Sequence, residues 1–215
     1  MTYSYKAVLF DCDGVIVDTE NLSNNLLRAM LKEQGLVLDD QTLHDQFTGF
    51  TNQENLRNAE AMLGKALPAN FDQDYRKKFQ ALMDETLEPI QGVPELLNKI
   101  QVPIAMATNA RRQEMNFKLN KIDLAERFKI RFCVEDVDHG KPAPDLYLKA
   151  AAAVGVAPKD CIVVEDSVAG IRAGCAAGMR VFAFSETVPA DLQLAAGATE
   201  VFDTMQQLEA LLNLS

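Results

Sequence analysis

The chain has 215 residues, of which 48% are hydrophobic and 24% are charged, a composition typical of a folded globular protein. Its 31 acidic and 21 basic residues give a net charge of -10 at pH 7. This charge disfavours nucleic acid and anionic membrane surfaces as partners, because both require a basic face. No apolar run approaches the length of a membrane span.

The four cysteines show no CxxC pairing. The first strand-like run begins near Tyr5, which leaves no room for a secretory leader. We therefore expect reduced thiols and a cytoplasmic protein, with a monomer as the default state of assembly.

The apolar run at residues 7–10 is followed by Asp11-Cys12-Asp13-Gly14, which indicates a strand that ends in a tight turn. Ligands of open α/β sheets bind at the carboxyl ends of strands, so the two acids stand where a site is expected. Asp and Gly are also ordinary turn residues, so this segment alone leaves a plain acidic turn as an alternative.

After a short β-like run at residues 15–17, the pattern is helical from about Thr19 to Glu88. The next strand is predicted at residues 102–107. A crossover between parallel strands needs only roughly 10–15 residues or a few more. The surplus therefore predicts an inserted helical cap. The predicted boundaries are residues 18–88 for the cap and residues 1–17 and 89–215 for the core.

From residue 102 onward, strand-like runs alternate with helical patterns. The predicted elements are a helix from Arg111 to about Phe128, a strand at 131–134, a helix at 146–154, a strand at 162–164, a helix at 168–177, strands at 180–184 and 200–202, and a helix at 205–212. This alternation predicts an α/β fold with a Rossmann-like, doubly wound parallel sheet.

Three further polar segments follow, or lie close after, strand-like runs, namely Thr108-Asn109, Lys141 and Glu165-Asp166. Parallel topology brings them to the same edge as Asp11 and Asp13. At ~4 Å and an effective dielectric near 20, each like-charge pair costs on the order of 4 kcal/mol, so clustered carboxylates need a cation. Oxygen ligands without a Cys or His partner favour Mg²⁺ over zinc.

The same edge can hold an anion. Lys141 supplies a positive charge and Thr108 a hydroxyl at an expected helix N-terminus, and together they can bind an oxyanion of phosphate size. Of the carboxylates of Asp11 and Asp13, one can attack phosphorus and the other can protonate the leaving oxygen. The hypothesis that follows is phosphoryl transfer through an aspartyl-phosphate.

These segments resemble the four motifs of the haloacid dehalogenase-like (HAD) hydrolase superfamily, and they occur in the right order along essentially the whole chain. The motifs are Asp11-Cys12-Asp13-Gly14-Val15, Ala107-Thr108-Asn109, Gly140-Lys141-Pro142-Ala143-Pro144-Asp145 and Val164-Glu165-Asp166-Ser167. The helical insertion is similar to the C1-type cap of the β-phosphoglucomutase-like phosphatases. The chain also resembles bacterial 6-phosphogluconate phosphatases in its general shape.

The resemblance implies that Asp11 is the nucleophile and that Asp13 is the general acid/base, which also offers its backbone carbonyl to Mg²⁺. The other implied roles are phosphoryl binding by Thr108, Asn109 and Lys141, and metal binding by Asp11 and Asp166, with Glu165 nearby or acting through water. The dehalogenases of the superfamily lack an acid at the position of Asp13, so the chain resembles the phosphotransferases.

The cap separates a phosphatase from a mutase. In β-phosphoglucomutase the first cap helix carries a histidine and a later loop carries an arginine that grips a second phosphate. The corresponding residues here are Ser23 and Asn52. A neutral amide cannot replace a bidentate guanidinium, which weakens the mutase alternative. Ser23, Asn52 and Gln53 are the candidate residues for contacting the leaving group.

The prediction is thus a Mg²⁺-dependent phosphatase that acts on small phosphorylated metabolites, above all sugar phosphates, with a cap that closes to exclude water. Two alternatives stay open. One is a phosphosugar mutase, which should need a bisphosphate activator. The other is a non-catalytic protein that binds phosphorylated metabolites, which would have no need of both Asp11 and Asp13.

Overall fold

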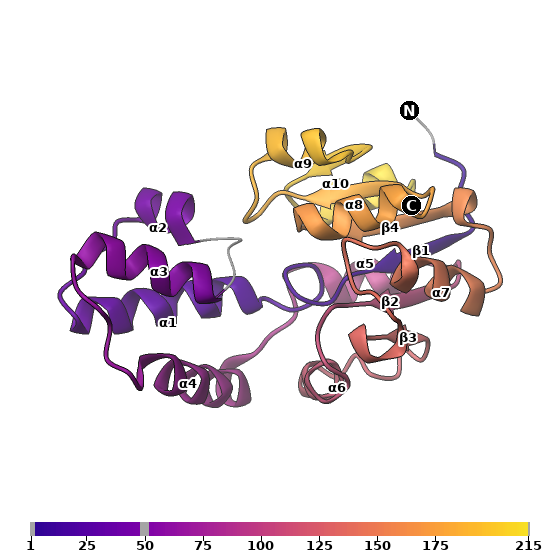
Figure 1. Cartoon of the computed structure of the whole chain (residues 1–215). Coiled ribbons are helices and arrows are strands. Elements are labelled where there is room, and N and C mark those ends of the chain that lie inside the picture. Colours follow the sequence, from indigo (N-terminus) through magenta and orange to yellow (C-terminus); the bar gives the residue numbers. More distant parts are fainter. Residues whose placement is uncertain (1–2, 48–51, 215) are drawn as a thin grey trace. The chain divides into compact units, whose positions relative to one another are not determined.

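The computed structural model describes residues 3–47 and 52–214, apart from the side chains of His44, Asp45 and Asn52. The chain forms two compact units, shown in Figure 1. The helical unit is Asp18–Leu87, and the core unit combines Met1–Val17 with Glu88–Ser215. The boundary thus falls one residue before the predicted one, because Glu88 belongs to the core unit.

In the described part of the core unit, six parallel strands form one sheet in the order β3-β2-β1-β4-β5-β6. The strands are β1 (Ala7–Phe10), β2 (Ile104–Ala107), β3 (Arg131–Phe132), β4 (Cys161–Glu165), β5 (Arg180–Phe184) and β6 (Glu200–Phe202). The predicted doubly wound α/β fold is confirmed. The order reverses direction between β1 and β4, and sheets of this kind bind ligands at that point.

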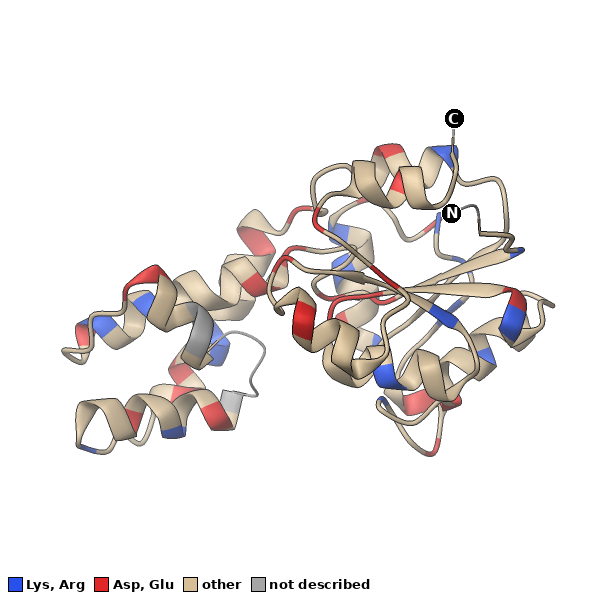
Figure 2. Cartoon of the chain, turned by 90° about the horizontal axis from the view of Figure 1, so that it is seen from above, with Lys and Arg blue, Asp and Glu red and all other residues tan. Residues whose placement is uncertain are grey.

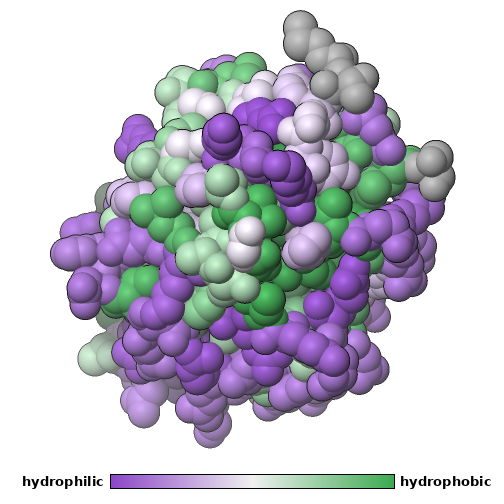
Figure 3. All heavy atoms as spheres, turned by 90° about the vertical axis from the view of Figure 1, so that its right-hand side faces the viewer, coloured by the Kyte–Doolittle hydropathy of each residue, from purple (hydrophilic) through white to green (hydrophobic). Residues whose placement is uncertain are grey.

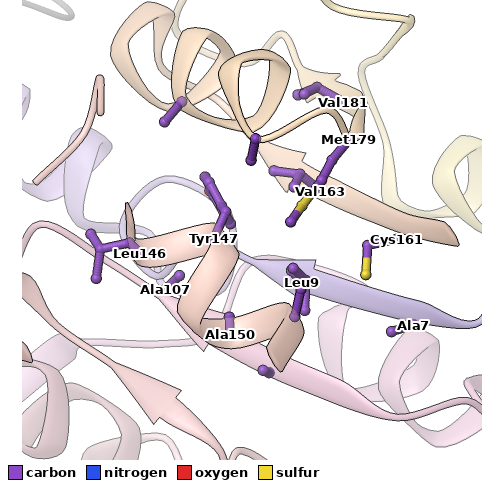
Figure 4. Close-up of a cluster of buried hydrophobic side chains, with 14 of the residues drawn as sticks. Ala7, Leu9, Ala107, Leu146, Tyr147, Ala150, Cys161, Val163, Met179 and Val181 are labelled. Atoms are coloured by element: carbon purple, nitrogen blue, oxygen red, sulfur yellow. The ribbon is translucent and has the colours of Figure 1, made fainter. Parts of the chain in front are cut away.

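Helices cover the sheet because both of its faces are apolar. The helices of the core unit are α5 (Val93–Lys99), α6 (Arg112–Lys121), α7 (Asp145–Ala153), α8 (Val168–Ala176), α9 (Ala190–Ala196) and α10 (Met205–Leu211), with 3₁₀ turns at Val134–Asp136 and Pro158–Asp160. Figure 4 shows Leu9, Val163 and Val181 of the strands directed toward the same cluster as Tyr147 of α7. Every residue of β1, β2 and β4 is buried, which is typical of strands covered on both faces.

The helical unit has its own apolar core. Its helices are α1 (Thr19–Glu33), α2 (Asp40–Phe47), α3 (Asn52–Leu63) and α4 (Phe71–Thr86). Leu27 and Leu31 of α1 pack with Phe47, Ala59 and Tyr75 in one buried cluster. Among the residues that the structure describes, no helix of either unit is both long and apolar enough to cross a membrane.

Two predictions of local structure were wrong. The β-like run at residues 15–17 forms a turn, in which Val17 makes isolated bridges to Asp13 and Pro89. The helix expected to reach Phe128 ends at Lys121, because Asp123 adopts a left-handed backbone conformation with φ of 58°.

Helices α5 and α9 were not predicted. Each has only seven residues, about two turns.

The amino-terminal edge of the sheet carries apolar surface. Figure 3 views the face at the right of Figure 1 and shows apolar side chains framed by hydrophilic ones. A groove of about 590 Å³ borders the start of β2, lined by residues 100–104 together with Glu126, Arg127, Lys129 and Ile130. This groove lies at the edge opposite to the strand ends that carry the predicted site residues.

Candidate active site

Parallel pairing of β1 with β4 brings the main acidic residues together. Phe10 is in register with Val164, and the N–H of Asp11 donates to the carbonyl of Val164 at 3.0 Å. Asp11 therefore leaves β1 beside Glu165, the last residue of β4. Figure 2 shows several acidic segments, in red, in the loops of the core unit.

A buried ammonium group joins these two carboxylates. The Nζ of Lys141 lies 2.6 Å from Oδ1 of Asp11 and 2.6 Å from Oε1 of Glu165. The side chain of Lys141 is only 4% exposed, and its Nζ lies 4.8 Å from the centre of the Tyr147 ring. A buried charge is tolerated only when it is paired, and Lys141 has two carboxylate partners.

Glu165 is saturated with hydrogen bonds. Its Oε1 accepts from Lys141 and from the hydroxyl of Tyr147 at 2.9 Å. Its Oε2 accepts from the backbone N–H groups of Asp166 and Ser167, both at 3.0 Å, and from the Ser167 hydroxyl at 2.9 Å. A carboxylate with two oxygens offers about four lone-pair positions, so five donors occupy it fully. The shortest of the five hydrogen bonds is the one from Lys141.

Two glycines make room for the acids. A Cβ on Gly170 in α8 would lie 1.6 Å from Oε1 of Glu165, which no side chain could tolerate. A Cβ on Gly14 would lie 2.1 Å from Oδ2 of Asp166, and Gly14 also has a φ of 70°. Both acids thus pack directly against backbone, which holds them close to the end of β1.

The loop that carries Lys141 is fastened to the end of β2. Asn109 donates through Nδ2 to the Lys141 carbonyl at 3.1 Å and accepts from the Lys141 N–H at 2.8 Å. A Cβ on Gly140 would lie 2.6 Å from Oδ1 of Asn109. The Thr108 hydroxyl accepts from the N–H of Ala110 at 3.1 Å and retains its own hydrogen for donation. The side chain of Asn109 is therefore engaged in positioning Lys141.

The acidic cluster has the donor set of a hard cation. One oxygen each from Asp11, Glu165 and Asp166 lies within 4.8 Å of the other two, and all three residues are buried. Together with Lys141 they carry two net negative charges when ionised. Carboxylate oxygens in such a cluster suit a divalent ion such as Mg²⁺.

The Asp13 carboxylate pairs with a different lysine from the one that joins Asp11 and Glu165. Its Oδ1 lies 2.5 Å from the Nζ of Lys118 in α6. Lys118 was not among the predicted site residues. It follows Met115 by three positions and precedes Leu119, and both of these residues are buried. A lysine on the apolar side of this helix was therefore the sequence feature that could have indicated a buried ion pair.

Burial and neighbouring charges shift the pKa values of Asp11 and Glu165 in opposite directions. Burial raises the pKa of Asp11 to about 7; Lys141 opposes this rise, whereas Glu165 and Asp13 add to it. Burial would also raise the pKa of Glu165, but Lys141 and the hydrogen bonds outweigh it and lower this pKa below its ordinary value. In the same network, burial disfavours the charged form of Lys141, yet the two carboxylates hold its pKa well above the usual range.

Two supporting residues also escaped prediction. Tyr147 lies on the apolar side of α7 and looks like an ordinary core residue in the sequence. Gln193 of α9 is completely buried and donates to the carbonyls of Asp166 at 2.8 Å and Phe184 at 2.7 Å. Its partners lie in the loop after β4 and at the end of β5, so no local pattern reveals them.

The predicted leaving-group residues all belong to the helical unit. The hydroxyl of Ser23 lies 2.7 Å from that of Tyr75, and Gln53 is exposed. The side chain of Asn52 lies outside the described residues. Contact of these three residues with substrate stays a prediction.

The comparisons with known proteins agree with this geometry. The family model "Haloacid dehalogenase-like hydrolase" matches residues 8–184. The chain is 34% identical over 181 residues to the 6-phosphogluconate phosphatase of Escherichia coli K12, covering 83% of this chain and 82% of the relative. It is 30% identical over 182 residues to the fructose-1-phosphate phosphatase of the same organism, covering 81% and 94%.

A solved structure is similar over almost the whole chain. A HAD family hydrolase from Deinococcus radiodurans R1, with bound phosphate and sodium, has a TM-score of 0.88 and 32% identity and covers 97% of this chain and 95% of its own.

The chain thus belongs to the haloacid dehalogenase-like hydrolases. Its similarity to named phosphatases places its activity among the phosphoric monoester hydrolases.

The raised pKa of Asp11 predicts how stability depends on pH when no metal is bound. The ordinary value of 3.8 applies to the unfolded chain and about 7 to the folded chain. Between these values the folded protein holds a proton that the unfolded chain has lost, so the contribution of Asp11 to stability falls as the pH rises from about 4 to about 7.

Urea unfolding in a chelator should therefore show a steeper loss of stability over this range for the wild type than for Asp11→Asn, which cannot titrate. Parallel curves for the two proteins would contradict the assignment.

Proposed function

We propose that the protein is a Mg²⁺-dependent phosphatase that hydrolyses small phosphorylated metabolites, sugar phosphates in particular, through a phosphorylated Asp11. The observation that carries this proposal is the contact of the Lys141 ammonium with Oδ1 of Asp11, at the strand end where three carboxylates gather. A carboxylate beside a fixed cation can approach a phosphate dianion without prohibitive repulsion.

Asp11, Asp166 and the backbone carbonyl of Asp13 would hold the metal ion. The ion would supply positive charge to the phosphoryl oxygens when bound. Glu165 is given a different role from the one predicted, because five donors already use its oxygens. It is the counter-ion that fixes Lys141.

In the first step an oxygen of Asp11 attacks phosphorus, and the bond from phosphorus to the ester oxygen breaks. Asp13 gives its proton to that oxygen, so the product leaves as a neutral alcohol. Lys141, the Thr108 hydroxyl and the backbone N–H of Asn109 bind the phosphoryl oxygens.

In the second step water attacks the phosphorus of phosphorylated Asp11. The Asp13 carboxylate, ionised after the first step, takes a proton from that water. The bond between phosphorus and Asp11 breaks, inorganic phosphate leaves, and both aspartates return to their starting states. The sum is one ester and one water converted to one alcohol and one phosphate.

Two kinds of support favour sugar phosphates. The relatives named above act on 6-phosphogluconate and fructose 1-phosphate. The residue at the position of the mutase arginine is Asn52, and an amide is a poor ligand for a second phosphate. A substrate with one phosphate and several hydroxyls is therefore favoured over a bisphosphate.

Phosphate release from a panel of hexose, pentose and aldonate phosphates tests the proposal. With Mg²⁺ the wild type should hydrolyse members of the panel, and Asp11→Asn should lose activity by on the order of 10³-fold or more, because the attacking oxygen is gone. Asp203→Asn, an exposed acid in the loop after β6, should keep wild-type activity.

Isomerisation that depends on added bisphosphate would replace this proposal by a mutase. Substrate binding without turnover would replace it by a binding protein.

The separate roles of Glu165 and Asp166 predict different responses to Mg²⁺. A ligand that binds only the folded state raises the melting temperature. We expect Asp166→Asn to lose this rise, because it removes a metal ligand. Glu165→Gln should keep the rise but lose most phosphatase activity, because Lys141 then has one carboxylate partner in place of two.

The melting temperature of each variant is measured with and without Mg²⁺, so that the rise is compared within one variant and does not depend on its basal stability. A rise that disappears in Glu165→Gln but persists in Asp166→Asn would reverse the assignment.

A further inference from the structure

A second buried ammonium group lies at the site. The side chain of Lys118 is 10% exposed, and its Nζ lies 2.5 Å from Oδ1 of Asp13, a residue 105 positions away in the sequence. Burial of a lysine costs free energy that one ion pair seldom recovers, and an apolar residue of similar volume would pack at least as well. Stability alone is therefore a weak reason for a lysine here.

The partner of Lys118 is the residue whose orientation matters most for proton transfer. The Asp13 side chain is 30% exposed and stands where the turn after β1 begins, so an ion pair with a buried ammonium can fix its direction. It is also close enough to Asp11 for its charge to act there, adding to the rise in the pKa of Asp11. Repulsion from the acidic cluster would push an unpaired Asp13 carboxylate toward solvent.

We propose that Lys118 is a positioning residue that holds the Asp13 carboxylate in the orientation from which it exchanges protons with the reacting oxygens. The proposal rests on the proposed function, in which Asp13 protonates the leaving oxygen. Lys118 reaches Asp13 from helix α6, in which the neighbouring Met115 and Leu119 are buried. The ammonium thus approaches Asp13 on a rigid element, which makes its position reproducible.

A structural ion pair that merely fastens α6 to the turn after β1 is the alternative. The two roles differ in how the rate depends on the leaving group. An aryl phosphate with a strongly acidic phenol leaves as a stable anion and needs no proton. An alkyl phosphate needs one. A misplaced Asp13 should therefore slow alkyl esters selectively, whereas a loosened fold should slow both esters equally.

The test compares Lys118→Met with Lys121→Met, which removes an exposed lysine from the end of the same helix. For Lys118→Met we expect kcat for glycerol phosphate or a sugar phosphate to fall by about 10- to 100-fold, and kcat for p-nitrophenyl phosphate to fall by less than about 3-fold, with KM for both little changed. Lys118→Arg should recover part of the alkyl rate. Lys121→Met should match the wild type on both esters.

The quantity to compare is the ratio of the alkyl and aryl rates, because it does not depend on how much of a variant is folded. Lys118→Gln gives a second, smaller polar replacement for the same ratio. An unchanged ratio in both Lys118→Met and Lys118→Gln would overturn the proposal.

Asp13→Asn separates this proposal from the proposed function. It should lower the alkyl-to-aryl ratio at least as much as Lys118→Met, and adding Lys118→Met to it should lower the ratio no further. A wild-type ratio in Asp13→Asn would show that Asp13 is not the acid and would overturn both. A low ratio in Asp13→Asn beside a wild-type ratio in Lys118→Met would overturn the role of Lys118 alone.

Discussion

The structure of this site depends on compensation of negative charge at the carboxyl ends of two adjacent parallel strands. Pairing of β1 with β4 places Asp11 beside Glu165, and the next residue adds Asp166. Such crowding would cost several kcal/mol per pair at an effective dielectric near 20. The ammonium group of Lys141 offsets this repulsion through its ion pairs with Asp11 and Glu165. The ammonium group of Lys118 offsets the charge of Asp13.

Two buried lysines thus serve different acids. Lys141 is held by Glu165, by the Tyr147 ring and, through its backbone, by Asn109. Its ammonium is therefore fixed from several sides before any substrate arrives, which is the preorganisation that phosphoryl transfer requires. Lys118 reaches Asp13 from α6 and leaves that carboxylate partly exposed. The more buried lysine thus accompanies the proposed nucleophile, and the other accompanies the proposed acid.

Much of this could be predicted from the sequence, because strand ends are local features. The acids at the ends of β1 and β4 and the Thr108-Asn109 pair follow apolar runs, and Lys141 lies in the loop after β3. Parallel topology brings such residues together. The partners of these side chains are not local. That Gly170 makes room for Glu165 follows only from how α8 packs against β4.

The role of Glu165 shows the same limit. A glutamate beside an aspartate in a strand-end motif suggests a pair of metal ligands, and its nearness to Asp11 and Asp166 agrees. Its five hydrogen-bond donors come from Lys141, from α7 and from the two residues before α8, and they support the proposed role as counter-ion of Lys141, which spacing cannot express. Residues that act through other residues become visible only when the fold is known.

The most direct test of this charge arrangement is a crystal structure of the protein soaked with Mg²⁺ and beryllium fluoride, which mimics a phosphoryl group on a carboxylate. The account predicts beryllium fluoride on Asp11, Mg²⁺ bound by Asp11, Asp166 and the carbonyl of Asp13, and Glu165 still paired with Lys141. A structure in which Asp11 is unmodified and Mg²⁺ is absent, or in which Glu165 has left Lys141 to bind the ion, would contradict it.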